Sequence, residues 1–255
     1  MTGMTENLST ELSDGEFAAR LAQQAGAILL DIRAAGELAG KALGQAGDEA
    51  ANAFICNAIR TYRPDDALLS EEEKDNPARC DRSRVWIVDP VDGTREYGEA
   101  RSDWAVHVGL AVDGAASLGA VALPGLDGGV VLRSDEPRSL PAAPDRPRMV
   151  VSRTRPAAEA VAVAELLGAE LVPMGSAGAK AMAVVRGEAE IYLHSGGQYE
   201  WDNCAPVAVA EAHGLFCSRI DGSPLHYNRR DPYLPDLLIC RPEWTGRVFA
   251  ALGKP

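Results

Sequence analysis

The 255-residue chain lacks the paired cysteines that a disulfide framework or a zinc site would need. Its five cysteines are scattered and include no CxxC pair, so we expect them to be reduced and without a shared role. Its four histidines show neither HxH nor HxxxH spacing. We expect an ordinary structural or surface role for each of them: His107, His194, His213 and His226.

Long apolar runs are missing as well. No stretch of about 18 or more apolar residues, the length that crosses a membrane as a helix, occurs in the chain. The polar start, residues 1–14, lacks the basic flank and the apolar stretch of a signal peptide. We therefore expect a cytoplasmic protein with no membrane partner.

Positive charge is scarce, because 25 Lys and Arg residues face 37 Asp and Glu residues and give a formal net charge of −12. This excess of negative charge argues against a nucleic-acid polymer or an anionic membrane as the main partner. Small anions stay possible ligands if a cation lies between them and the protein. The apolar content of 46% is enough to fill a core.

The chain divides near its middle at a proline-rich segment. Residues 134–147, SDEPRSLPAAPDRP, carry four prolines and no apolar periodicity, which predicts a linker or loop. We expect an N-terminal half, residues 1–133, and a C-terminal half, residues 148–255. A cleft between two such halves commonly holds a small ligand.

Apolar spacing predicts the elements of both halves. In the first half we expect two helices, a buried strand and a series of strands separated by turns, at residues 17–36, 48–62, 85–89 and 104–133 respectively. In the second half we expect strands at 148–153, 169–174 and 190–194, alternating with helices at 158–168, 177–187 and 205–214. This alternation is typical of α/β layered folds.

The segment WIVDPVDGTREY, residues 86–97, places two aspartates directly after a buried strand. Burying an ionised carboxylate costs several kcal/mol unless it has a partner, so Asp89 and Asp92 need one. Pro90 and Gly93 are turn residues that could bring both side chains to one point. A metal ion is a candidate partner.

Two further acidic segments adjoin predicted elements. Glu71, Glu72 and Glu73 follow the short apolar stretch in LLSEEEKD, and Asp202 stands at the start of a predicted helix in YEWDNCAP. Carboxylate oxygens without nitrogen or sulfur donors suit Mg²⁺ rather than zinc. Each segment alone has a simpler explanation: a helix cap at Asp202, a turn at Asp92 and Gly93, or a solvated charge run at residues 71–73.

Three segments, LLSEE, WIVDPVDGT and EWDNCAPVAVAEAHG, resemble the signature segments of the Mg²⁺-dependent, lithium-sensitive inositol monophosphatase superfamily. This superfamily includes fructose-1,6-bisphosphatases and 3′(2′),5′-bisphosphate nucleotidases, and the resemblance covers the chain from about Phe17 onward. It implies an αβαβα sandwich, a homodimer, and two or three Mg²⁺ ions per active site. Mn²⁺ would substitute for Mg²⁺, and Li⁺ would inhibit.

The resemblance also implies a ligand set. Glu71, Asp89 and the backbone carbonyl of Val91 would hold the first Mg²⁺, and Asp89, Asp92 and Asp202 would hold the second. Two cations placed in this way can grip both the attacking and the leaving oxygen of a phosphoryl transfer.

In the family, a threonine and an upstream aspartate activate the attacking water, and a glutamate assists them. Here these would be Thr94, Asp48 and Glu71. Asp48 lies 23 residues before Glu71 and opens the predicted helix 48–62, but the threonine of the family's TxxD stretch is absent. A helix cap is the competing role for Asp48.

Substrate contacts are implied at positions outside the ligand set. The backbone amides of Gly93 and Thr94 would face a phosphate, and Asp202 would also contact the substrate. Four more residues lie in segments that resemble the nucleotide-facing parts of the bisphosphate nucleotidases: Ser152, Arg153, Ser176 and Lys180. The alternative is that Lys180 is a solvated helix residue and Arg153 a loop charge.

Within the superfamily, the motifs resemble the bisphosphate nucleotidase branch most. A glutamate precedes Trp-Asp in YEWDNC, and LLSEE replaces a GEE form. We therefore expect hydrolysis of 3′-phosphoadenosine 5′-phosphate to AMP, which recycles a by-product of sulphate activation. The alternatives are inositol-1-monophosphatase or fructose-1,6-bisphosphatase activity, or a regulator that binds metal and phosphate without turnover.

Overall fold

The computed structural model describes residues 8–126 and 128–254. The first seven residues of the polar start and Asp127 of the predicted DGG turn lie outside the described residues. No described helix is long and apolar enough to cross a membrane.

The described elements alternate between helix and strand in both halves of the chain. The helices are α1 (Asp14–Ala35), α2 (Gly40–Tyr62), the 3₁₀ helix η1 (Pro77–Asp81), α3 (Thr94–Gly98), α4 (Ala158–Leu167), α5 (Ala177–Val185), α6 (Glu200–Ala212) and α7 (Pro242–Ala251). The strands are β1 (Ala67–Ser70), β2 (Arg84–Asp92), β3 (Ala105–Val112), β4 (Ala115–Leu123), β5 (Val130–Arg133), β6 (Arg148–Ser152), β7 (Glu170–Met174), β8 (Ile191–Tyr199), β9 (Phe216–Ser218) and β10 (Tyr233–Cys240).

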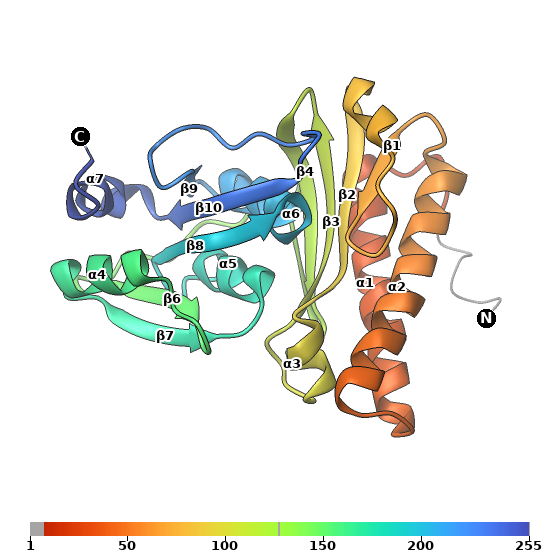
Figure 1. Ribbon diagram of the computed structural model, residues 1–255, viewed down its shortest axis with the longest axis horizontal. Helices are drawn as coiled ribbons and strands as arrows, with labels where there is room; N and C mark the ends of the chain where they lie inside the picture. Colours follow the sequence, from red (N-terminus) through yellow and green to blue (C-terminus); the bar gives the residue numbers. More distant parts are fainter. Residues whose placement is uncertain (1–7, 127, 255) are drawn as a thin grey trace.

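These elements form five layers (Figure 1). Helices α1 and α2 cover one face of a five-stranded sheet with the order β1-β2-β3-β4-β5. Helices α5 and α6 lie between this sheet and a second five-stranded sheet with the order β7-β6-β8-β10-β9. Helices α4 and α7 cover the outer face of the second sheet. The predicted αβαβα sandwich is confirmed.

The first sheet is a meander apart from its first strand. Strands β2 to β5 pair antiparallel in chain order, and β1 pairs parallel with β2. Strand β2 is buried along almost its whole length because helices cover both faces of the sheet. This explains why its sequence reads as a continuous apolar run rather than an alternating one.

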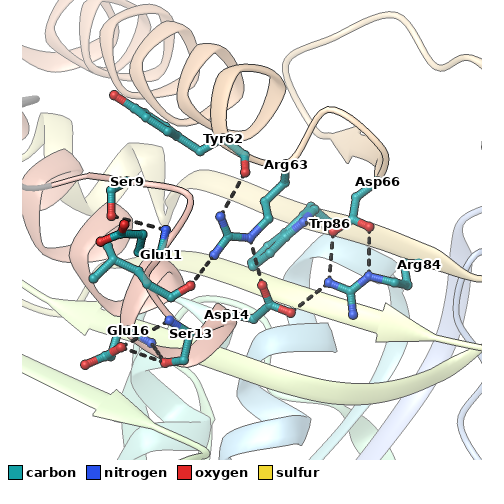
Figure 2. Close-up of polar contacts among 11 residues, drawn as sticks. Ser9, Glu11, Ser13, Asp14, Glu16, Tyr62, Arg63, Asp66, Arg84 and Trp86 are labelled. Atoms are coloured by element: carbon teal, nitrogen blue, oxygen red, sulfur yellow. Dashed lines mark hydrogen bonds and ion pairs between the residues drawn. The ribbon is translucent and has the colours of Figure 1, made fainter.

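Polar contacts fix α1 against the end of α2 and the start of β2 (Figure 2). Ser13 caps α1, and Asp14 in the first turn accepts hydrogen bonds from Arg63 at 2.8 Å and from Arg84 at 2.7 Å. Arg84 also pairs with Asp66, whose carboxylate accepts the indole N–H of Trp86 at 2.9 Å. This cluster holds the three elements together at the end of β2 opposite to Asp92.

The predicted start of the second helix is wrong. We expected residues 48–62, but α2 begins at Gly40, so Asp48 lies inside the helix and cannot cap it. Gly44 and Gly47 lower the helix propensity of the first turns by roughly 1 kcal/mol each and conceal the helix in the sequence. Strands β9 and β10 and helix α7 were not predicted.

Residues 134–147 form neither helix nor strand, as expected for a linker. The two sheets fall on either side of this segment. Helix α6 of the C-terminal half nevertheless packs on β3 and β4 of the N-terminal half. The two halves therefore pack against each other, and their division into domains stays a prediction.

Helix α6 approaches the first sheet closely because two glycines face it. A Cβ at Gly109 would lie 2.9 Å from the backbone nitrogen of Ala205, and a Cβ at Gly119 would lie 2.4 Å from the Ala205 carbonyl oxygen. Backbone atoms cannot move aside as a flexible side chain can. These glycines therefore set how near α6 lies to the sheet.

We expect Gly119→Ala to lower the free energy of unfolding by about 2 kcal/mol, because the added methyl group pushes the α6 backbone away from β4. Urea denaturation of the metal-free protein measures this loss. Gly246→Ala is the matched control: it lies in α7 with no atom within 4 Å of an added Cβ, and we expect no loss and a gain of up to about 1 kcal/mol. Equal effects at both positions would contradict the packing argument.

Candidate active site

A break in the pairing of β2 creates the centre of the site. Asp89 pairs with His107 and Asp92 pairs with Ala105, so two residues of β2 oppose one residue of β3. Pro90 lies in this bulge and has no N–H to donate to the ladder. Bulges of this kind bend a strand and redirect its side chains.

Three carboxylates meet at this bulge. Asp89, Asp92 and Asp202 each place one carboxylate oxygen within 4.8 Å of those of the other two. Asp89 and Asp92 are buried, and Asp202 is partly buried. The structure thus brings together three of the predicted ligands from two distant segments of the chain.

Burial and mutual repulsion act on the protonation of these groups. Burial, followed by the charges of Glu71 and Asp92, raises the pKa of Asp89 well above its usual range. Burial and the charge of Asp92 raise the pKa of Asp202 to about 6. Three carboxylates held within 4.8 Å of one another would repel less with a cation between them.

Glu71 faces the same cluster from the end of β1. Its backbone N–H donates to the Val88 carbonyl at 3.3 Å, which places the residue beside β2. Glu71 stands at the solvent-facing edge, yet the surrounding protein removes part of its hydration. This desolvation and the charge of Asp202 raise the pKa of Glu71 to about 7.

The other two glutamates of the acidic run differ from Glu71. Glu73 forms an ion pair with Arg60, and Glu72 is exposed and adds negative charge near Asp48. A surface charge run therefore describes Glu72 and Glu73, whereas Glu71 interacts with the three aspartates from outside the group whose oxygens lie within 4.8 Å of one another.

Asp92 is held by the start of α5 and by a histidine. Its carboxylate accepts the backbone N–H groups of Ala177 at 3.1 Å and Gly178 at 2.5 Å. His107 places Nε2 3.3 Å from Asp92 Oδ2 and Nδ1 3.0 Å from the Trp201 carbonyl oxygen. Burial opposes ionisation of Asp92, but His107 and the N–H of Gly178 hold the pKa of Asp92 below its usual range.

His107 is a site residue that the sequence reading missed, since it gave every histidine an ordinary role. Its ring joins the DPVDGT segment to the residue before Asp202. Burial opposes its charge, while Asp92 raises the pKa of His107 above its usual value. A histidine inside the apolar strand WAVHVG needs a buried polar partner, and this was the available signal.

Asp202 caps α6 and also places an oxygen in the carboxylate cluster, so the predicted helix cap does not exclude the predicted ligand. It lies in the first turn of α6, and its Oδ2 accepts the N–H of Tyr199 at 2.6 Å as part of a capping box. A carboxylate has a second oxygen with free lone pairs. The helix cap thus fixes the side chain while leaving an oxygen for the cluster.

Asp48 and Thr94 face each other across α2 and α3. Thr94 Oγ1 lies 3.4 Å from Asp48 Oδ1 and 3.1 Å from the carbonyl oxygen of Val91. Gly44 makes this approach possible, because a Cβ there would lie 2.7 Å from Cγ2 of Thr94. Burial and the charge of Glu72 raise the pKa of Asp48 to about 7, where it can exchange a proton near neutral pH.

A cavity of about 650 Å³ opens beside this pair. Asp48, Glu72 and Thr94 form the wall near the carboxylate cluster, and the remaining lining residues come from the first turns of α2 and from α3 and its end. The lining does not include Asp89, Asp92 or Asp202. The cavity therefore exposes Asp48 and Thr94 to a small molecule, while the three aspartates lie outside its lining.

Lys180 and Ser176 lie close to the cluster but have internal partners. Ser176 caps α5 by accepting the N–H of Ala179, and a Cβ at Gly93 would meet its Cβ at 2.8 Å. Lys180 is buried and donates to the carbonyls of Gly175 and Ser176. The alternative of a solvated helix residue is wrong for Lys180. Burial lowers the pKa of Lys180 to about 8, although nearby Asp92 opposes this shift.

Arg153 and Ser152 lie farther along the same edge. Arg153 forms an ion pair with Asp103 and lies 3.6 Å from Glu96, so two carboxylates already neutralise its charge. Ser152 accepts the backbone N–H of Arg155 at 3.3 Å. Neither residue contacts the carboxylate cluster in this structure.

Glu200, whose place before Trp-Asp favoured the nucleotidase branch, points away from the cluster. It is fully buried and accepts the backbone N–H groups of Asn228 at 2.7 Å and Arg229 at 2.8 Å. Any effect of Glu200 on substrate choice is therefore indirect.

The fold and the acidic cluster define a member of the inositol monophosphatase family. The family model described as "Inositol monophosphatase family" matches residues 13–252, and the chain belongs to this family of phosphatases. The family predicted from the three motifs is confirmed.

Two curated relatives represent the range of similarity. A Mycobacterium leprae (strain TN) protein named 3′-phosphoadenosine 5′-phosphate phosphatase is 48% identical over 245 residues, which cover 91% of this chain and 90% of the relative. The 3′(2′),5′-bisphosphate nucleotidase CysQ of Escherichia coli (strain K12) is 31% identical over 201 residues, which cover 74% and 81% of the two chains.

Solved structures share the fold at lower identity. CysQ from Bacteroides thetaiotaomicron superimposes with a TM-score of 0.75 and 24% identity, covering 91% of this chain and 98% of the other. Inositol monophosphatase from Anabaena (Nostoc) sp. PCC 7120 gives a TM-score of 0.72 and 22% identity, with 94% and 96% coverage.

We expect Asp89→Asn to stabilise the metal-free protein increasingly as the pH rises from about 4 to about 7. An acid whose pKa is raised in the folded state binds more protons there than when unfolded, so stability is lost as the pH rises through that window. The Asn side chain can still accept the Val91 N–H that Asp89 accepts at 3.1 Å. Urea denaturation without metal across this pH range should show a larger gain at pH 7 than at pH 4.

Asp14→Asn serves as the control, because the pKa of Asp14 is shifted in the opposite direction to that of Asp89. Burial opposes ionisation of Asp14, but its bonds to Arg63 and Arg84 lower its pKa, so its contribution to stability is present above its unfolded pKa and is lost in acid. This variant should be less stable than the parent at pH 7. Destabilisation by Asp89→Asn at pH 7 would contradict the repulsion argument.

Proposed function

We propose that the protein is a Mg²⁺-dependent phosphatase that hydrolyses 3′-phosphoadenosine 5′-phosphate to AMP and phosphate. The 48% identity to a relative named for this reaction, over about nine-tenths of both chains, is the observation that carries the proposal. The reaction would remove a by-product of sulphate activation. The homodimer, the cytoplasmic location and inhibition by Li⁺ remain predictions that follow from the motifs and composition.

The donor atoms support Mg²⁺ as the cation. The cluster offers only carboxylate oxygens, and no cysteine or histidine belongs to the group of possible ligands found among the described residues. Oxygen-only sites suit Mg²⁺, with Mn²⁺ as a substitute. In this proposal Glu71, Asp89 and the Val91 carbonyl hold one ion, and Asp89, Asp92 and Asp202 hold another, and the family resemblance implies two or three ions per active site.

When bound, the cations supply positive charge to the phosphate and make water more acidic. The protein's own contribution is to orient the phosphate. Gly93 has φ +88°, precedes α3 and has no side chain, so the N–H groups of Gly93 and Thr94 can approach a phosphate oxygen closely. Asp202 completes the contacts to the substrate.

Asp48 and Thr94 are the proposed pair that accepts the proton of the attacking water. The Thr94 hydroxyl donates to the Val91 carbonyl oxygen at 3.1 Å and lies 3.4 Å from Asp48 Oδ1, so its lone pairs are free to accept a hydrogen bond from the attacking water. Asp48 can take up the proton because its pKa lies at about 7. Glu71, on the opposite side, assists in orienting the water.

The second phosphate of the substrate requires a cation of its own. Lys180 is the stronger candidate, because its partners are two backbone carbonyls and it keeps a third N–H. Arg153 would first have to leave Asp103 and Glu96. We propose that Ser152, Arg153 and Ser176 contribute to the wall around the nucleotide.

Two alternatives belong to other substrate or function classes. Inositol 1-phosphate or fructose 1,6-bisphosphate would present the same phosphate to the same carboxylates. A non-catalytic regulator would keep the metal ligands and lack water activation, which the missing upstream threonine near Asp48 makes conceivable.

We expect 3′-phosphoadenosine 5′-phosphate to give the highest kcat/KM among three candidate phosphates at equal Mg²⁺. Phosphate release from it, from inositol 1-phosphate and from fructose 1,6-bisphosphate is the measurement, with EDTA as the control that should abolish release. A tenfold or greater preference for inositol 1-phosphate would replace the nucleotidase proposal. Release that persists in EDTA would rule out a metal-dependent reaction.

We expect Asp48→Asn to lower kcat by about 10²–10³, because the amide cannot accept the proton of the water. The Mg²⁺ concentration for half-maximal activity should change little, since Asp48 is not among the proposed ligands. Gln45→Ala, in the same cavity wall, is the control and should retain activity. An unchanged kcat in Asp48→Asn would assign water activation to another group.

A further inference from the structure

Buried polar side chains from two other segments hold the loop between β9 and β10 in place. In this loop Asn228 has φ +59° and is one of the few described residues other than glycine with a left-handed backbone. Asparagine tolerates this conformation better than most residues. Such outliers persist where surrounding contacts hold them in place.

The first set of contacts comes from the segment that follows Glu71. Arg79, buried in η1, donates to Asn228 Oδ1 at 3.0 Å and to the Arg229 carbonyl at 2.9 Å. Asn228 Nδ2 returns hydrogen bonds to the carbonyls of Arg79 at 3.0 Å and Arg82 at 3.1 Å. Arg79 also pairs with Asp75 at 2.7 Å, four residues after Glu71.

The second set of contacts comes from the start of α6. Glu200 is the first residue of this helix, two positions before Asp202, and it is fully buried. Its two carboxylate oxygens accept the N–H groups of Asn228 at 2.7 Å and Arg229 at 2.8 Å. Both oxygens of Glu200 are thus used by the loop, and none is directed at the carboxylate cluster.

The loop therefore connects two segments that carry candidate ligands. The segment after β1 carries Glu71, and α6 carries Asp202. These two carboxylates carry charge of the same sign near one site, so they repel each other. Without a fixed connection, this repulsion would move the two segments apart whenever no cation lies between them.

We propose that Arg79, Asn228 and Glu200 act as a positioning clamp that keeps Glu71 and Asp202 at the separation needed for cation binding. The clamp touches neither substrate nor cation, so its members are positioning residues. The inference rests on the proposed function, because it assigns the clamp to the same cation site. Groups that orient metal ligands from behind commonly change metal affinity by 10- to 100-fold when altered.

Asn228→Gly is the variant that tests the clamp. Glycine adopts the left-handed backbone and keeps the N–H that donates to Glu200, but it removes every side-chain contact to Arg79 and Arg82. Mn²⁺ binding followed by electron paramagnetic resonance should show about tenfold weaker affinity. At saturating Mg²⁺, kcat should stay within about threefold of the parent, because the catalytic groups are unchanged.

Asp113→Gly is the matched control. Asp113 also has a left-handed backbone, with φ +49°, and lies in the turn between β3 and β4. Within the part of the chain that the structure describes, its side chain forms no hydrogen bond or ion pair with Arg79, Asn228 or Glu200. We expect parental Mn²⁺ affinity in this variant, with circular dichroism confirming that all variants are folded.

A double-mutant cycle tests whether Asn228 and Glu200 act together on Mn²⁺ affinity or destabilise the protein independently. Glu200→Gln disturbs the same loop from the α6 side, so the loss of Mn²⁺ affinity in Asn228→Gly with Glu200→Gln should be smaller than the sum of the single losses. Additive losses would show that the two residues act independently and would overturn the clamp.

The remaining outcomes distinguish the clamp from the proposed function. If the parent binds Mn²⁺ and releases phosphate while Asn228→Gly binds Mn²⁺ with parental affinity, the clamp is wrong and the phosphatase proposal stands. A lowered melting temperature with unchanged Mn²⁺ affinity also overturns the clamp. If the parent neither binds Mn²⁺ nor releases phosphate, the proposed function fails and the clamp fails with it.

Discussion

Repulsion among carboxylates at the end of β2 is the constraint on which the rest of the site depends. Asp89, Asp92 and Asp202 hold oxygens within 4.8 Å of one another, two of these side chains being buried. Such an arrangement costs free energy in the metal-free protein and persists only because the surrounding structure fixes each group. Four features fix these carboxylates: the bulge at Pro90, the amides at the start of α5, the ring of His107 and the cap of α6.

The layers of the fold bring the site residues together from separate parts of the chain. Strand β2 brings Asp89 and Asp92, the central helix layer brings Asp202 and the α5 amides, and α2 brings Asp48 toward Thr94. Close approach between layers requires small residues, and Gly44, Gly109 and Gly119 stand where backbones or short side chains meet. The same packing that builds the core therefore sets the distances in the site.

The acidic motifs could be found in the sequence because an ionised carboxylate directly after a buried strand needs a partner. The family was predicted from the resemblance of three segments to its signature segments. Contacts between distant segments could not be predicted. The position of His107 in an apolar strand indicated a buried polar partner but not that the partner is Asp92, and the hydrogen bond between Arg79 and Asn228 spans 149 positions. The start of α2 was hidden because Gly44 and Gly47 lower helix propensity locally and serve packing against α3. Strand β10 was missed since Pro235 interrupts its apolar pattern at a register shift.

The central claim is that the carboxylate cluster is a cation site built around a shared aspartate. Anomalous diffraction from crystals grown with Mn²⁺ tests it most directly, because the scattering locates the ions independently of any activity. The account predicts at least two peaks bridged by Asp89, one also bound by Glu71 and the other by Asp92 and Asp202. Ordered crystals saturated with Mn²⁺ that show no peak at this cluster would contradict it.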